Sequence, residues 1–189
     1  MVAIQESDCG SARSCDLTAA LGEISGHLFM LTGKNRDIAG IARHGLGLLS
    51  RFPFYEARME GLPSPIPGRG IMIVKIVTPA GLITVCNTHL SLSRRIRLAQ
   101  AHFIGGLLRQ EGECVLMGDF NCGADSREML EIRHAGAFHT KQTAPTYPSW
   151  NPRRDLDHVL VSRAFPVLSH GPLPHVVSDH LPVYAEVCV

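Results

Sequence analysis

Short apolar runs rich in β-branched residues recur along the chain and constrain its fold more than any other feature. The clearest pair, residues 71–77 and 82–87, flanks the turn sequence Pro79-Ala80-Gly81 and predicts a β-hairpin. Similar runs predict strands over residues 2–5, 27–31, 45–49, 115–117, 156–161 and 183–187. Strands interspersed with helical stretches predict an α/β (α+β) fold.

Three stretches between these runs predict helices. Asp16 can cap a helix over residues 17–23, and Ser126 can cap a helix that runs through Arg133. The longest helix is predicted over residues 94–110, where apolar residues recur at three- and four-residue steps. A length of 189 residues suits one domain with a sizeable core, so residues 1–189 are expected to form a single domain.

Composition and charge exclude several classes of protein. A formal net charge of +1 argues against a dedicated DNA-binding protein, which more often carries a strong basic excess. The chain has no signal-peptide pattern and no apolar run near the ~20 residues that span a bilayer, so a cytoplasmic location without a transmembrane segment is expected. Its six cysteines show neither metal-binding spacing nor a context for disulfides. No obligate protein partner is evident.

Polar residues cluster beside five of the apolar runs. The clusters are Gln5-Glu6, Asn87-Thr88-His89, Gly118-Asp119-Phe120-Asn121, Asp155-Leu156-Asp157-His158 and Ser178-Asp179-His180. Because strand ends commonly meet at one cleft, the five clusters are expected to face one site. Carboxylate and amide oxygens without cysteine favour Mg²⁺, with Mn²⁺ as the alternative, over zinc. A hard metal ion beside His and Asp side chains suits phosphoester hydrolysis.

Six motifs, taken in order, resemble those of the DNase I-like endonuclease/exonuclease/phosphatase family. The similarity is greatest to small bacterial members, which often carry a stretch like Thr146-Tyr147-Pro148-Ser149-Trp150 before the strand with the Leu-Asp-His motif. The motifs are Ala3-Ile4-Gln5-Glu6, Leu49-Ser50-Arg51-Phe52-Pro53, Asn87-Thr88-His89-Leu90, Gly118-Asp119-Phe120-Asn121, Leu156-Asp157-His158-Val159 and Ser178-Asp179-His180-Leu181-Pro182. The resemblance spans nearly the whole chain and implies a four-layer sandwich, in which two packed mixed β-sheets are flanked by helices. Family members begin with a strand that ends in Asn, so the resemblance also implies that the first strand is missing and the domain N-terminally incomplete.

The same resemblance implies catalytic roles for five residues. His180 would be the general base or transition-state stabiliser, and Asp157 would orient its imidazole and favour its charged form. His89 would donate a hydrogen bond to a phosphate oxygen or act as the general acid. Asp119 would position the attacking water or a second metal ion, and Asn121 would hold the phosphate or the nucleophile.

The metal ligands implied by the resemblance are Glu6, Asp119 and Asp179, the last either as a direct ligand or as a partner of one. The predicted function is a Mg²⁺-dependent phosphodiesterase, endonuclease or phosphatase. Its substrate would be a phosphoester in a nucleic acid, a phospholipid headgroup or a small phosphodiester. The alternative is a catalytically impaired homologue that acts as a binding or regulatory module.

Structural roles compete with the catalytic ones. Asp119 and Asn121 are both common in turns, and His180 or His89 could be a half-buried histidine with satisfied hydrogen bonds. Asp155 is expected to be an exposed neighbour of Arg153 and Arg154, and His158 to be structural because it points to the opposite face of its strand. Arg94, Arg95 and Arg97 are expected to form a solvated helix start.

Overall fold

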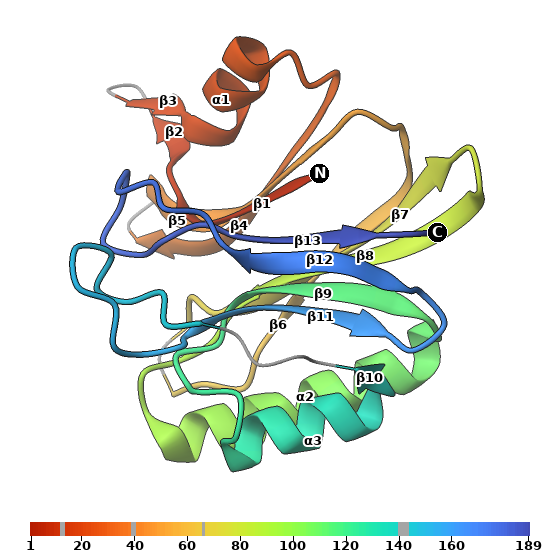
Figure 1. Ribbon diagram of the computed structural model, residues 1–189. Helices are drawn as coiled ribbons and strands as arrows, with labels where there is room; N and C mark the ends of the chain where they lie inside the picture. The colour runs from red at the N-terminus through yellow and green to blue at the C-terminus, as the bar shows by residue number, and fades with distance from the viewer. Residues whose placement is uncertain (12–13, 39–40, 66, 140–143) are drawn as a thin grey trace. The chain divides into compact units, whose positions relative to one another are not determined.

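The computed structural model describes residues 1–11, 14–38, 41–65, 67–139 and 144–189. These residues form two compact units, Met1–His89 and Leu90–Val189, hereafter the N-terminal unit and the C-terminal unit. Each unit combines strands with helices (Figure 1). The mixed α/β class is therefore confirmed, and the single domain over residues 1–189 stays a prediction.

The described part of the N-terminal unit contains one helix, two larger antiparallel sheets and the small strand pair β2 and β3. Its elements are β1 (Val2–Ser7), β2 (Cys9–Ser11), β3 (Ser14–Asp16), α1 (Leu17–Ser25), β4 (Phe29–Ile38), β5 (Ile41–Ser50), β6 (Phe54–Gly61), β7 (Gly70–Thr78) and β8 (Gly81–His89). The first sheet has the order β1-β5-β4, and the strands β8-β7-β6 are neighbours in the second. The predicted hairpin is confirmed as β7 and β8.

Close packing joins α1 to the first sheet. Asp16 caps the helix as predicted, because its side chain accepts a hydrogen bond from the backbone N–H of Ala19. A Cβ atom at Gly47 of β5 would lie 2.2 Å from the Thr18 hydroxyl, so glycine is required where the helix crosses this strand. The Thr18 hydroxyl also lies 2.7 Å from that of Ser7, which joins the helix to β1.

The core of the N-terminal unit lies between its two sheets, where β1 and β5 contact β8. Large, fully buried side chains of the unit come from β5 and β7: Leu46, Leu48, Ile71, Met72, Ile73 and Ile76. Side chains alternate along a strand, so Ile71 and Ile73 lie on the other face of β7 from Met72 and Ile76. Burying one such side chain contributes about 1.5 to 3 kcal/mol. The apolar runs that predicted strands therefore also form the core.

The C-terminal unit contains the other two predicted helices and two further groups of strands. Its elements are α2 (Arg94–Glu111), β9 (Cys114–Asp119), α3 (Arg127–Ala135), β10 (Phe138–His139), β11 (Asp157–Ser162), β12 (Val167–Pro172) and β13 (Val183–Val187). Strands β10-β11-β9 are neighbours in one sheet, and β12 pairs with β13. Helices α2 and α3 lie side by side on one side of β9 and β11, and β12 and β13 lie on the other (Figure 1).

The register of β9 and β11 positions the candidate site. The strands are antiparallel, and Asp119, the last residue of β9, lies directly opposite Asp157, the first residue of β11. Directly opposed residues in such a pair have Cβ atoms about 4.5 to 5.5 Å apart. The buried residues Leu116 and Leu160, also opposite each other, fix this register from the core side.

Two longer strands, β6 and β12, were not predicted from the sequence. Strand β6 carries Glu56, Arg58 and Glu60 and is at the end of its sheet, where charged side chains are tolerated and the apolar pattern is weak. Strand β12 ends in Gly171-Pro172, two residues that are depleted in strands. In both strands pairing with a neighbour outweighs local propensity.

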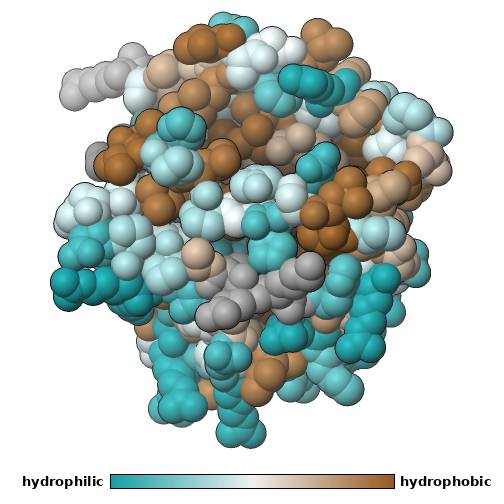
Figure 2. Space-filling model, in the orientation of Figure 1, coloured by the Kyte–Doolittle hydropathy of each residue, from teal (hydrophilic) through white to brown (hydrophobic). Residues whose placement is uncertain are grey.

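The surface carries apolar as well as polar side chains, as Figure 2 shows for one face. Isolated apolar residues are normal on a protein surface. Within the described part of the chain, no helix has the length and apolar character needed to cross a membrane.

Candidate active site

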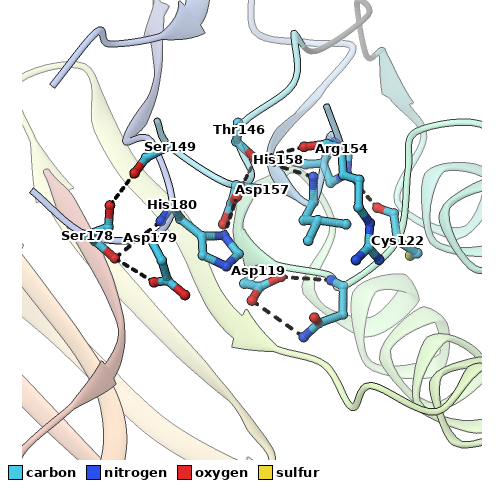
Figure 3. A network of polar contacts seen from close by, with 12 residues as sticks. Asp119, Cys122, Thr146, Ser149, Arg154, Asp157, His158, Ser178, Asp179 and His180 are labelled. Carbon is cyan, nitrogen blue, oxygen red and sulfur yellow. Dashed lines mark hydrogen bonds and ion pairs between the residues drawn. The ribbon is translucent and has the colours of Figure 1, made fainter. Parts of the chain in front are cut away.

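Three predicted site residues of the C-terminal unit come together in one cluster. Asp119, Asp157 and His180 each offer one ligand atom, and these atoms lie within 4.8 Å of one another. The two carboxylates come from the paired strand ends, and His180 comes from the segment before β13 (Figure 3). Residues 119, 157 and 180 are far apart in sequence, so the tertiary structure creates the cluster.

His180 and Asp157 form a hydrogen-bonded pair. Nδ1 of His180 lies 2.8 Å from Oδ2 of Asp157, and the two side chains are 25% and 14% exposed. The hydrogen bond to Asp157 raises the pKa of His180 above its ordinary value, although partial burial opposes the shift. The negative charges of Asp157, Asp119 and Asp179 also raise this pKa. The pairing leaves Nε2 as the ring nitrogen that can exchange a proton with a reacting group.

A threonine hydroxyl holds the Asp157 carboxylate from a second direction. Thr146 is fully buried, and its Oγ1 donates a hydrogen bond of 2.5 Å to the same Oδ2 atom of Asp157 (Figure 3). No role for Thr146 followed from the sequence. The available signal was its place in the family-like stretch 146–150 before the strand that carries Asp157, but such a position does not predict a side-chain contact.

Asp119 and Asn121 form the tight turn that follows β9. The backbone N–H of Asn121 donates to Oδ1 of Asp119 at 2.8 Å, and Asn121 has a φ of +53°, which asparagine tolerates better than most residues. The Asn121 amide donates to the Leu90 carbonyl at 2.9 Å. The turn expected as the competing role is thus present, and it holds Asp119 within the cluster.

A largely buried ion pair supports the segment that Asn121 binds. Arg97 Nε lies 3.2 Å from the Glu128 carboxylate, and the side chains are 11% and 1% exposed. Arg97 also donates to the Ser91 and Leu92 carbonyls, next to the Leu90 carbonyl that Asn121 binds. The expectation that Arg97 belongs to a solvated helix start is therefore wrong, because Arg97 fixes the segment between β8 and α2.

His158 and Asp155 bind the loop that follows Asn121. His158 is buried, its Nε2 lies 2.9 Å from the Cys122 carbonyl, and burial lowers its pKa. The structural role predicted for His158 is confirmed. Asp155 is half-buried and accepts a hydrogen bond of 2.8 Å from the backbone N–H of Ala124, so its predicted exposed position is wrong.

Asp179 lies beside the cluster and outside it. Its side chain is exposed, and its Oδ1 accepts a hydrogen bond from the Ser178 hydroxyl at 3.1 Å. Its charge still contributes to the raised pKa of His180. The role of Asp179 as a metal ligand stays a prediction.

Two further predicted site residues, Glu6 and His89, lie together in the N-terminal unit. Oε1 of Glu6 lies 3.8 Å from Nδ1 of His89, and the Glu6 side chain is 63% exposed. Glu6 occupies a β-bulge at the end of β1 with a φ of +53°, a conformation that costs a non-glycine residue about 1 to 3 kcal/mol. Such strain is concentrated at functional sites, which favours a binding role for Glu6.

Asn87 connects the two sheets beneath Glu6. Its amide nitrogen donates to the carbonyls of Ile4 and Gly47, and its Oδ1 accepts a hydrogen bond of 2.7 Å from Gln5. Asn87 is buried, so these bonds satisfy its polar atoms. It therefore fixes the end of β1 that presents Glu6, a role that the sequence did not reveal.

The donor set of the Asp119, Asp157 and His180 cluster suits a hard divalent cation. Two carboxylates supply oxygen atoms, and Mg²⁺ keeps several water ligands when few protein atoms bind it. The cluster differs from the ligand set implied by resemblance, because Asp157 and His180 are already bonded to each other. Asp119 is the residue common to both sets.

Comparison with known proteins places the sequence in one group. A family model described as "Endonuclease/Exonuclease/phosphatase family" matches residues 1–180. Among curated proteins, none matches the sequence.

Solved structures match the fold at low sequence identity. An endonuclease/exonuclease/phosphatase from Beutenbergia cavernae has a TM-score of 0.80 and 22% identity, and the match covers 98% of this chain and 61% of that protein. A mannosyl-6-phosphatase from Bacteroides thetaiotaomicron has a TM-score of 0.76 and 16% identity, over 92% of this chain and 81% of that one. Beta toxin from Staphylococcus aureus, solved with bound magnesium ions, has a TM-score of 0.72 and 14% identity, over 89% and 80%. The chain thus spans less than two thirds of the first of these proteins.

Proposed function

The chain belongs to the endonuclease/exonuclease/phosphatase family, whose members act on phosphoesters, and we propose that it is a metal-dependent phosphoester hydrolase. One observation carries the proposal. The His180–Asp157 pair lies in the same cluster as Asp119. A proton acceptor therefore lies within 4.8 Å of a carboxylate that suits a hard cation.

His180 is proposed as the general base. Its Nε2 atom accepts a proton from the attacking water, and the Asp157 carboxylate stabilises the imidazolium that forms. Asn121 holds a phosphoryl oxygen or the nucleophile, and His89 donates to a phosphoryl oxygen. These assignments follow the family motifs and the positions of the side chains in their own units.

Asp119, Glu6 and Asp179 are the proposed metal ligands. When bound, Mg²⁺, or Mn²⁺ in its place, would neutralise phosphoryl charge and lower the pKa of a coordinated water. Support comes from the carboxylates of the cluster and from the bound magnesium in the structurally similar beta toxin.

The proposed substrate is a phosphoester in a nucleic acid, a phospholipid headgroup or a small phosphodiester. The structural neighbours include a sugar-phosphate phosphatase, so a phosphomonoester belongs in the same test. With a net charge of +1, the chain is not suited to tight binding of long duplex DNA by charge alone.

The test is hydrolysis of bis-p-nitrophenyl phosphate with Mg²⁺, with and without EDTA, and of p-nitrophenyl phosphate in parallel. We expect EDTA to abolish activity and His180→Ala to lower kcat at least about a hundredfold, the scale of a lost acid–base group. His102→Ala is the matched control, because the His102 side chain is 79% exposed on α2. Equal rates for wild type and His180→Ala would refute the assignment.

A further inference from the structure

The segment 146–149 is fixed against the segment that carries His180. The Leu181 backbone N–H donates to the Thr146 carbonyl at 2.9 Å, and the Ser149 N–H donates to the Asp179 carbonyl at 2.8 Å. The Ser149 hydroxyl donates to the Ser178 carbonyl at 2.5 Å (Figure 3). These three bonds enclose His180, because they involve the residues on both sides of it.

Tyr147 extends from this fixed segment onto the imidazole. The ring centroids of Tyr147 and His180 are 4.8 Å apart, with an angle of 48° between the ring planes. The Tyr147 backbone is itself held, since its N–H donates to the Arg154 carbonyl and its carbonyl accepts from the Arg154 N–H, both at 3.0 Å. The Arg154 guanidinium carbon lies over the Tyr147 ring, 5.9 Å from its centroid.

From this geometry we infer that Tyr147 is a positioning residue, which sets the orientation of the His180 imidazole in the reaction proposed above. The hydrogen bond to Asp157 fixes one ring atom, Nδ1, and a single bond leaves the ring free to swing about that contact. The Tyr147 ring, in contact with the imidazole at a centroid distance of 4.8 Å, restricts that motion. Nε2 therefore keeps one orientation. That this orientation matters for catalysis rests on the proposed function, whereas the orientation itself does not.

The kinetic test compares Tyr147→Leu with Tyr147→Phe. Loss of the ring in Tyr147→Leu should lower kcat about 10- to 100-fold, the cost of a misplacement near 1 Å. KM should stay within about threefold of the wild-type value, because Tyr147 acts through His180. Tyr147→Phe keeps the ring face and should restore kcat. Tyr55→Leu is the matched control, since Tyr55 is 72% exposed on β6.

An NMR measurement tests the positioning independently of catalysis. The Tyr147 ring should shift the His180 ring protons upfield in the wild type and in Tyr147→Phe, but not in Tyr147→Leu, and the two rings should show nuclear Overhauser contacts. Comparison with His180→Gln assigns the signals among the ten histidines. Absence of the contacts in the wild type, or equal losses of kcat in Tyr147→Phe and Tyr147→Leu, would overturn the inference. If the wild type shows the nuclear Overhauser contacts but hydrolyses no substrate, the positioning of His180 by Tyr147 is supported and only the proposed function is refuted.

Discussion

Replacing Thr146 with valine removes the hydroxyl that donates to Asp157, together with its longer contacts to the Leu156 N–H at 3.4 Å and the Arg154 carbonyl at 3.5 Å. Valine has nearly the shape of threonine but lacks the hydroxyl that donates to Asp157. Thr146 is fully buried, so water cannot reach the carboxylate along the same path. Thr146→Ser makes the opposite change, because it keeps the hydroxyl and removes one methyl group.

The expected magnitudes differ between the two variants. A hydrogen bond to a charged partner contributes about 1.5 to 3 kcal/mol, which is the free energy of unfolding that Thr146→Val should lose. Loss of one buried methyl in Thr146→Ser should cost about 0.5 to 1.5 kcal/mol. For a chain of this size, the valine variant should melt about 3 to 12 °C lower than wild type.

Urea denaturation followed by far-UV circular dichroism measures both variants. The expected order of stability is wild type, then Thr146→Ser, then Thr146→Val, although valine resembles threonine more closely in shape. A valine variant as stable as wild type, or more stable than the serine variant, would show that the hydroxyl does not hold Asp157.

Two further predictions concern charges in the C-terminal unit. Arg97→Met leaves Glu128 buried without its partner and should lower the free energy of unfolding by about 3 to 5 kcal/mol. Adding Glu128→Leu should restore most of this loss, because it removes the unpaired charge. Urea titration of the single and double variants measures both changes. Because the hydrogen bond to Asp157 raises the pKa of His180, Asp157→Asn should move the His180 titration to lower pH in metal-free protein, as followed by NMR. The pair accordingly stabilises the fold while His180 is charged, and this contribution is lost as pH rises through the raised pKa; a titration unchanged by Asp157→Asn would contradict this account.

Local sequence patterns predicted the features of the fold that depend on a few neighbouring residues. Asp16 and Ser126 cap their helices as expected, because a cap needs only a side-chain oxygen three residues before a free N–H. The hairpin of β7 and β8 followed from its turn and its β-branched strands. Strands β6 and β12 could not be predicted in the same way, because their pairing partners decide their conformation.

For the candidate site too, the sequence indicated which residues take part but not how they are arranged in space. Asp119, Asp157 and His180 lie in polar clusters beside apolar runs, and the resemblance to the family motifs singled them out; in the structure their side chains form one cluster. The short distance between the Asp119 and Asp157 carboxylates depends on the register of β9 and β11, which cannot be read from the sequence. The convergence of Glu6 and His89 on this cluster stays a prediction.

The supporting roles of three residues, including Asn87 from one of the predicted polar clusters, escaped prediction for a different reason. Thr146, Asn87 and Gln100 are ordinary polar residues, and Asn87 binds carbonyls 83 and 40 positions away in the sequence. Each is almost completely buried, and a buried polar group must be hydrogen-bonded to avoid a cost of about 1 to 3 kcal/mol. Burial, rather than residue type, therefore identifies these three residues as ones that hold the site in place. Gln100 illustrates this, because it binds both the N–H and the hydroxyl of Ser91 and thereby holds the segment whose Leu90 carbonyl receives Asn121.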